Sequence, residues 1–403
     1  MTTDKHNKRP NVPPLRFPEF TEPWEQHLTT DFFEFKNGLN PDVKRFGTGI
    51  KFISVMDILN NRYITYDKII SAVEAKDSDL RDFGVNYGDI LFQRSSETLE
   101  DVGRANVYLD EKPALFGGFV IRGKRIGDYN PLFFRYLLSS PSVRKRIIVK
   151  GAGAQHFNIG QDGLSKVSLF VPSAKEQDRI AQLLNAIDKR IEVQSGLIEK
   201  LESLMSGITL NISKSDDCES IRLSEILTER NEVNTAQYEV YSVSVSQGVV
   251  NQVDYLGRSF AAKDTSNYNV VHYGDIVYTK SPTGDFPYGI VKRSGQTDPV
   301  AVSPLYGVYK PASNEIGCFL HYYFCNPVSA KNYLHKLIQK GAKNTINITN
   351  QRFLENTIKV PKAEKLTIVV KLLNHISAKK QHAEELLTYY RKQKRYFLSQ
   401  MFI

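Results

Sequence analysis

The chain has 403 residues, which is too long for a single ordinary core, so two or three domains are expected. A hydrophobic fraction of 41% and an aromatic fraction of 11% exclude an intrinsically disordered chain. The net charge of +9 fits an acidic partner, either nucleic acid or an anionic membrane surface, although many soluble proteins reach such a charge without either.

The first segment, residues 1–14, is polar and rich in proline and lacks the apolar centre of a signal peptide, so we expect a disordered tail. No later window approaches the roughly 20 apolar residues that span a bilayer. The cysteines Cys218, Cys318 and Cys325 form no CxxC pair and cannot all pair within one chain. This favours a reducing, cytoplasmic compartment.

A globular region of mixed strands and helices is expected at 15–172. Pro131–Ser139 is predicted to be a helix, because Asn130 can cap it and proline is tolerated in a first turn. Apolar runs predict strands at 89–93, 116–123 and 168–172.

A long helix is predicted at 173–210, because apolar residues recur there at alternating steps of four and three. This spacing is a heptad stripe, typical of a coiled coil, and the helix would be about 50–55 Å long. The stripe consists of Ile180, Leu184, Ile187, Ile191, Gln194, Ile198, Leu201, Met205 and Ile208.

The rest of the chain repeats this order, with a polar linker at 211–217, a globular region at 218–361 and a last helix at 362–403. Strands are predicted at 275–280 and 305–310, and a helix at 328–339. The last helix has the same heptad stripe, made of Val369, Leu373, Ile376, Lys380, Ala383, Leu387, Tyr390, Lys394 and Phe397.

Sequence matches at a nearly constant offset in residue number indicate an internal duplication. Tyr87-Gly88-Asp89-Ile90 recurs as Tyr273-Gly274-Asp275-Ile276, an offset of 186. Phe133, Tyr136 and Pro141 match Phe319, Tyr322 and Pro327 at the same offset, and Val171-Pro172 matches Val360-Pro361 at 189. Because the matches keep their order, we predict two structural copies.

The expected fold class is therefore α+β. Two tandem mixed α/β domains are separated and followed by long helices, which would most simply bury their apolar stripes against each other. Gln194, Lys380 and Lys394 interrupt the apolar seam. We favour frayed or partly solvated positions there over polar residues that set the register of the pair.

Motifs for catalysis are missing from the sequence. There is no G-x-x-x-x-G-K-[ST] phosphate loop, no H-E-x-x-H motif and no Cys/His cluster. Asn130-Pro131-Leu132-Phe133 approaches the [DN]-P-P-[FY] loop of adenine methyltransferases but lacks its second proline. His375 and His382 are interpreted as solvated helix residues. We expect no catalytic residues, no metal site and no cofactor in this chain.

Basic and polar loops lie at matching places in the two copies. Glycine allows close backbone approach, lysine and arginine neutralise phosphates, and Gln, Asn and Arg can contact base edges. The alternative for each loop is an ordinary solvated turn. The residues predicted to bind DNA are Arg94, Ser95, Ser96, Lys150, Gln155, His156, Asn158, Lys280, Ser281, Thr283, Lys343, Asn344 and Asn347.

With two variable halves, each followed by a heptad helix, the chain resembles the specificity (S) subunit of type I restriction-modification systems. "PPLRFPEFTEPWEQHL" (13–28), "YGDIL", "GAGAQHFNI" and the closing "RKQKRYFLSQMF" (391–402) are similar to that family. The resemblance implies that each globular half reads one part of a bipartite, asymmetric double-stranded DNA site. It implies that the fold is two tandem mixed α/β target recognition domains, separated and followed by long helices that pair as an antiparallel coiled coil with pseudo-two-fold repetition. It also implies that the helices set the spacing and dock two modification (adenine methyltransferase) subunits.

The same resemblance places S-adenosylmethionine, ATP and Mg²⁺ on modification and restriction subunits, not on this chain. The basic stretch 391–395 could contact DNA or a partner subunit, and the sequence does not separate these. Two rival functions remain open: a solitary nuclease or methyltransferase of which this is a part, and a structural coiled-coil protein.

Overall fold

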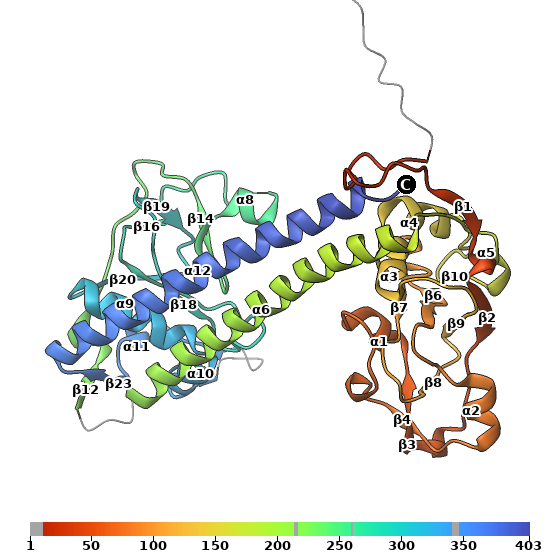
Figure 1. Cartoon of the computed structure of the whole chain (residues 1–403). Coiled ribbons are helices and arrows are strands. Elements are labelled where there is room, and N and C mark those ends of the chain that lie inside the picture. The colour runs from red at the N-terminus through yellow and green to blue at the C-terminus, as the bar shows by residue number, and fades with distance from the viewer. Residues whose placement is uncertain (1–10, 213–216, 259–260, 341–345) are drawn as a thin grey trace, which may run out of the picture. The chain divides into compact units, whose positions relative to one another are not determined.

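The computed structural model describes the chain except for residues 1–10, 213–216, 259–260 and 341–345 (Figure 1). It divides into two compact units. Unit 1 runs to Gln194 and includes Leu386–Ile403, and unit 2 is Ser195–Glu385. No helix among the described residues is long and apolar enough to cross a membrane.

Unit 1 is built around a four-stranded antiparallel sheet in the order β2-β9-β5-β7. A second sheet, β4-β3-β8, and the pairs β1-β11 and β6-β10 complete its β-structure. The strands are β1 Glu25–Leu28, β2 Phe33–Asn37, β3 Phe46–Ile53, β4 Ala72–Val73, β5 Ile90–Gln93, β6 Ser95–Ser96, β7 Ala105–Val107, β8 Leu115–Phe116, β9 Val120–Arg125, β10 Phe157–Asn158 and β11 Ser168–Val171. The helices are α1 Val55–Asn60, α2 Asp77–Phe83, α3 Pro131–Ser139, α4 Pro141–Ile148 and α5 Gln161–Ser165, with short 3-10 turns at Thr29–Asp31, Val43–Arg45, Tyr66–Lys68 and Leu99–Asp101.

The predicted helix cap of α3 is confirmed. Asn130 accepts a hydrogen bond from the backbone N–H of Phe133 (3.0 Å), and Pro131 occupies the first turn. Phe133 and Phe134 are then buried in the main core of unit 1, which also holds Trp24 and strand β5. The cap therefore fixes the start of the helix that covers the sheet.

Unit 2 has a four-stranded antiparallel sheet in the order β13-β20-β17-β18 and the pairs β12-β23, β14-β15, β16-β19 and β21-β22. The strands are β12 Cys218–Arg222, β13 Leu227–Glu229, β14 Tyr241–Ser244, β15 Gly248–Asn251, β16 Asn269–Val271, β17 Ile276–Thr279, β18 Ile290–Arg293, β19 Val300–Val302, β20 Gly307–Pro311, β21 Gln339–Lys340, β22 Ile346–Asn347 and β23 Thr357–Pro361. The helices are α7 Leu223–Ile226, α8 Gln252–Leu256, α9 Asn314–Cys325, α10 Pro327–His335 and α11 Asn350–Phe353.

The central sheets of the two units share their register. In unit 1, Ile90 of β5 is paired with Gly123 of β9; in unit 2, Ile276 of β17 is paired with Tyr309 of β20. Both pairs are related by the offset that the repeated motifs show in the sequence. The predicted α+β fold with a tandem internal repeat is confirmed.

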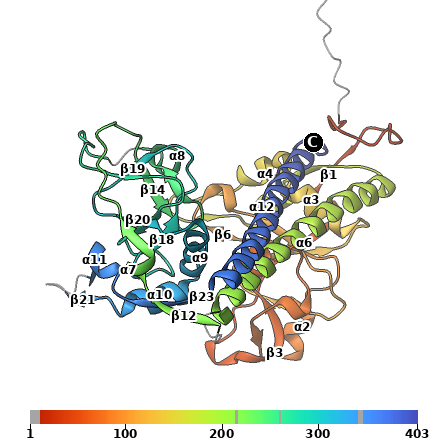
Figure 2. The ribbon, with the colours of Figure 1, turned by 90° about the vertical axis from the view of Figure 1, so that its left-hand side faces the viewer.

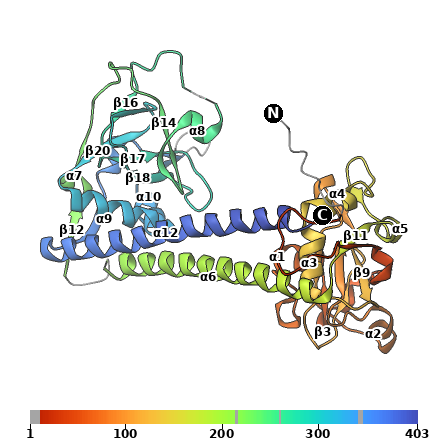
Figure 3. The ribbon, with the colours of Figure 1, turned by 45° about the horizontal axis from the view of Figure 1, so that its top comes forward.

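The long helices α6 (Ala174–Ile212) and α12 (Ala363–Gln400) each contribute to both units. Within each unit their segments run side by side in opposite directions (Figures 1 and 3). In unit 1, Ile180 and Leu184 of α6 pack in one core with Met401 and Phe402, beyond the end of α12. In unit 2, Ile208 packs against the core that holds Val369, Val370 and Leu373.

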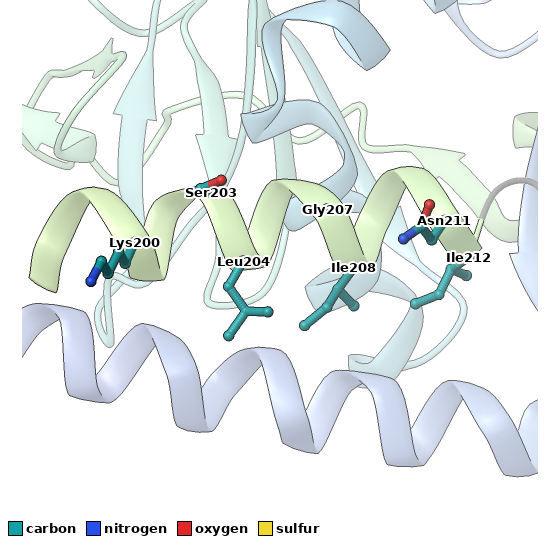
Figure 4. Close-up of a pocket in the computed structure, with 7 residues that line it drawn as sticks. All are labelled: Lys200, Ser203, Leu204, Gly207, Ile208, Asn211 and Ile212. Atoms are coloured by element: carbon teal, nitrogen blue, oxygen red, sulfur yellow. The ribbon is translucent and has the colours of Figure 1, made fainter.

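The stripe positions predicted for the helix seam lie on the faces of α6 and α12 that are turned away from solvent. Those that are buried are Ile180, Leu184, Ile187, Val369, Leu373, Ile376 and Leu387. Those that are half-buried are Ile191, Ile198, Leu201 and Tyr390. Figure 4 shows Leu204, Ile208 and Ile212 of α6 extending toward α12 along a shallow hollow in unit 2.

The two seam lysines are partly solvated, with 27% of the Lys380 side chain and 24% of the Lys394 side chain exposed, and each also forms an ion pair. Lys394 Nζ lies 2.6 Å from Asp188 Oδ1, and Lys380 Nζ lies 2.7 Å from Glu202 Oε1. Each lysine therefore pairs with a carboxylate of the facing helix while part of its side chain remains in water. Such pairs fix the register of two helices.

Three boundaries differ from the sequence-based expectation. Residues 1–10 lie outside the described residues, but the rest of the predicted tail is packed: Asn11 O accepts from Trp24 N (2.8 Å), and Pro13 is buried. Helix α6 continues to Ile212, into the expected linker, because Ile212 joins the core of unit 2. The helix expected at 328–339 is α10, which begins at Pro327, capped by Asn326, and ends at His335.

Candidate nucleic-acid interface

The repeated Tyr-Gly-Asp-Ile motif makes the same turn in both units. Gly88 and Gly274 both have φ of +89°, a left-handed conformation that side chains disfavour. Asp89 accepts from the backbone N–H groups of Asn86 and Arg125, both at 2.9 Å. Burial raises the pKa of Asp89, while these hydrogen bonds oppose the shift. The motif is thus a structural turn that leads into the central strand.

In unit 2 the equivalent aspartate has a charged partner. Asp275 accepts from the backbone N–H of His272 (2.8 Å) and is clamped by Arg230, whose Nε and Nη2 lie 2.7 and 3.0 Å from its two oxygens. Hydrogen bonding to Asp275 raises the pKa of Arg230, against the effect of its burial. The sequence analysis gave no role to this aspartate. It lies three residues after His272, however, and an aspartate at that spacing can accept from the backbone N–H at the start of a turn.

The structure brings the two predicted DNA-binding segments of unit 1 together. Strand β6, directly after Arg94, pairs with β10, and Ser95 Oγ donates to Asn158 Oδ1. Arg94 accepts at its carbonyl from Ile159 N (3.0 Å). Two loops that are far apart in the chain therefore form one surface at the end of β5.

The side chains on this surface divide into anchored and exposed ones. Arg94 is half-buried and donates from Nη1 to Gly118 O (3.3 Å). Ser96 is half-buried and accepts from Thr98 N (3.3 Å). The exposed residues of the predicted set are Lys150, Gln155, His156 and Asn158. Asn158 is anchored as well, because its amide accepts from Ser95 Oγ and donates to His156 O (3.3 Å), so Lys150, Gln155 and His156 are the side chains open to a ligand.

The basic run before this loop has another role. Arg144 donates from Nη2 to the carbonyls of Glu100 (2.8 Å) and Val102 (2.7 Å), and Arg146 Nη1 donates to Ser168 O (3.2 Å). Burial lowers the pKa of Arg144 to about 10. These two arginines therefore tie the fold together, and only Lys145 of the run is exposed.

The first predicted loop of unit 2 follows β17. Lys280 is half-buried, and burial lowers its pKa although Glu229 opposes the shift. Ser281 and Thr283 are exposed, and the backbone of Thr283 pairs with that of Phe286. Lysine and hydroxyl groups thus occupy the place that Arg94 and two serines hold in unit 1.

The second predicted loop of unit 2 is only partly described. Lys343 and Asn344 lie outside the described residues. The main chain of Asn347 pairs with Gln339 in the β21-β22 pair. This pair follows α10 as the bridge between Ala152 and Asn158 follows α4, so a short paired main-chain segment occurs at this place in both units.

Among the described residues, no group of three or more His, Cys, Asp and Glu side chains is placed to hold a metal ion. His375 and His382 are exposed on α12.

Comparison with known proteins assigns the first half of the chain. A family model described as "Type I restriction modification DNA specificity domain" matches residues 21–203. Residues 21–203 are thus similar to this family. The specificity domain therefore takes in the globular part of unit 1 and most of α6.

Two curated relatives agree with this assignment. The chain is 29% identical over 153 residues to the type I restriction enzyme EcoKI specificity subunit of Escherichia coli, which covers 37% of this chain and 32% of that protein. It is 25% identical over 207 residues to the putative type I restriction enzyme MjaX specificity subunit of Methanocaldococcus jannaschii, covering 50% and 48%. The matches thus span a third to a half of these relatives' length.

Solved structures share the fold of this chain over nearly its whole length. The S subunit of a type I restriction-modification system from M. genitalium has a TM-score of 0.60 at 15% identity, covering 97% of this chain and 99% of that one. A chain from a structure of type I R-M complex assembly and conformational transition has a TM-score of 0.51 at 11% identity, covering 93% and 96%. At these identities the likeness concerns the fold.

Proposed function

We propose that this chain is the non-catalytic, sequence-specific DNA-binding subunit of a type I restriction-modification complex. The observation that carries the proposal is the repeated surface at the end of the central strand: Arg94 and Lys280, related by the repeat offset, follow β5 and β17 in the same register. A duplicated reader with different side chains at one place suits a site whose two halves differ in sequence.

In this proposal the target recognition domains are 15–172 and 218–361, and each reads one half of a bipartite double-stranded site. The net charge of +9 suits contact with the phosphate backbone of DNA. Exposed Lys150 and half-buried Arg94 supply phosphate or guanine contacts in the first half. Lys280 does so in the second.

The paired helices act as spacer and dock in this proposal. Their lengths, 39 residues for α6 and 38 for α12, help to set the gap between half-sites and raise the effective concentration of the second domain once the first has bound. Two modification subunits dock on them, and restriction subunits join the complex. S-adenosylmethionine, ATP and Mg²⁺ bind to those subunits and not to this chain. The complex works in the cytoplasm.

The decisive test is the sequence preference of the purified full chain, alone and with its modification subunits. Selection from a random duplex library should enrich two short conserved blocks with a fixed gap, and single-molecule sequencing of the host genome should find methylated adenines in the same pattern. A protein that enriches no sequence in either state contradicts the proposal and favours the structural coiled coil. If the chain alone methylates or cuts DNA, the solitary enzyme is correct.

A further inference from the structure

Each unit has an exposed apolar side chain at the same place, next to the basic residue that directly follows β5 or β17. Phe119 lies just before β9 in unit 1 and is 70% exposed. Leu305 lies shortly before β20 in unit 2 and is 72% exposed. Their numbers differ by the repeat offset of 186.

The turns that present these side chains are equivalent. Val120 N donates to Gly117 O (2.9 Å), and Tyr306 N donates to Ser303 O (2.9 Å), so each closes a four-residue β-turn. Phe119 and Leu305 are the third residues of these turns. The following strands pair with β5 and β17 in the same register.

In unit 1 the apolar side chain is joined to the candidate interface by the backbone. Arg94 N donates to Phe119 O (2.9 Å), and Arg94 Nη1 donates to Gly118 O (3.3 Å). Phe119, just before β9, and Arg94, just after β5, thus flank two adjacent strands and lie side by side at the same end of the sheet. In unit 2 the strand register places Leu305 across from Lys280, because Tyr278 is paired with Gly307 and both chains continue in opposite directions.

A single exposed apolar residue is common on protein surfaces and requires no explanation. The repetition argues for a function here, since the rest of the turn has changed from Gly117-Gly118 to Ser303-Pro304 while a large apolar side chain remains. Third positions of β-turns usually favour small or polar residues. A side chain that gains little from burial in the fold is available to a ligand.

We propose that Phe119 and Leu305 are base-contacting residues, each making the apolar part of sequence recognition in its half-site beside the cation at Arg94 or Lys280. This inference rests on the proposed DNA-binding function. Cations on the interface bind phosphates or guanine, whereas an apolar side chain has no favourable contact with phosphate. The partner of an apolar side chain in the major groove is the methyl group of thymine. The change from Phe to Leu fits two halves that read different sequences.

The test uses the full chain, with its modification subunits where they co-purify, and a duplex that carries the selected site. Phe119→Ser and Leu305→Ser should each weaken binding to this duplex by roughly 5- to 150-fold, the range for losing recognition of one base pair in a site. Affinity for a scrambled duplex of the same length should not change, because phosphate contacts are intact. Thermal unfolding of both variants should match the wild type, since both side chains are exposed.

Ile126→Ser is the matched control, because Ile126 is 57% exposed and lies at the opposite end of β9. It should bind both duplexes like the wild type. Phe119→Ser should also relax base preference only in one half of the site, and Leu305→Ser only in the other.

If both serine variants bind the selected duplex as tightly as the wild type, the inference is wrong while the proposed function stands. A wild type that does not distinguish the selected from the scrambled duplex overturns the proposed function, and this inference with it.

Discussion

Lys394 of α12 and Asp188 of α6 form a cross-helix ion pair in the apolar seam of unit 1, with Nζ 2.6 Å from Oδ1. The Asp188 side chain is 5% exposed and also accepts from Tyr136 Oη at 2.8 Å. Arg135 Nη1 lies 3.4 Å from the same carboxylate. One buried carboxylate therefore joins both long helices to α3, which packs against the first part of α6 in the core of unit 1 (Figure 2).

Asp188→Asn should destabilise the protein by about 3–5 kcal/mol, because Lys394 and Arg135 then lose their common counter-charge in a buried site. The measurement is the shift of the urea unfolding curve. Glu202→Gln is the matched control. Glu202 pairs with Lys380, which lies two heptads before Lys394 in α12, but the Glu202 side chain is 53% exposed. Its cost should be about 0–1 kcal/mol. Equal shifts for the two variants would show that burial of Asp188 has no effect.

Leu184→Asp and Leu373→Asp should each cost more than about 3 kcal/mol, because a charged side chain replaces one that is fully buried between helix and core. The same substitution at exposed Val193 of α6 or Ile368 of α12 should cost less than about 1 kcal/mol. Thermal unfolding followed by circular dichroism compares the four. A Leu184→Asp protein with wild-type stability would contradict the seam assignment.

Asp275→Ala should destabilise unit 2 by about 3 kcal/mol, since it removes both the clamp on Arg230 and the acceptor for the backbone of His272. Exposed Asp285, in the loop after β17, is the control and should cost about 0.5 kcal/mol or less on change to Ala. Hydrogen exchange of the amide of His272 gives a local readout. Unchanged protection of this amide in Asp275→Ala would exclude the capping role.

Cys325 should react with iodoacetamide at neutral pH much faster than Cys218. Burial acts to raise the pKa of Cys325, but His321 and Lys292 outweigh it and lower the value to about 6. Lys292 Nζ lies 3.2 Å and His321 Nε2 3.7 Å from Sγ. Burial raises the pKa of Cys218. The alkylation rate at Cys325 should therefore rise as pH increases through about 6 and level off above it.

Lys292→Gln is the test variant for this ion pair, because it keeps a polar side chain but removes the charge. The midpoint of the alkylation profile of Cys325, followed by peptide mass spectrometry, should move to higher pH. A profile that is the same in Lys292→Gln and the wild type would show that the ammonium group does not hold the thiolate.

Arg94→Ala and Lys280→Ala should weaken DNA binding by the full chain. Loss of a base contact costs about 1–3 kcal/mol at one position of the site, whereas loss of a phosphate contact weakens binding to all sequences and lowers the salt slope by about 1. Lys166→Ala is the control, because Lys166 is exposed and pairs with Asp162 on the preceding helical turn. Fluorescence anisotropy at several salt concentrations separates the cases. Wild-type affinity and salt slope in both variants would make these loops ordinary turns.

Several features followed from the sequence because they depend on neighbours along the chain. The heptad stripe of Ile180 and Leu184 reflects the period of a helix, and the cap of α3 needs only Asn130 and the first helical turn. The duplication was visible as repeated residues at a constant offset. These local and repeated patterns predicted the α+β fold and the position of its long helices.

The environment of individual side chains was decided by the tertiary structure, because it depends on residues far apart in the chain. Phe119 lies in an apolar run that predicts a buried strand, yet the turn at Gly117 leaves it exposed. Arg144 belongs to a run of three basic residues, yet its side chain donates to backbone carbonyls of a segment more than 40 residues earlier. The sequence by itself thus determined the repeat and its elements, whereas long-range packing decided which charges are paired and which side chains face a ligand.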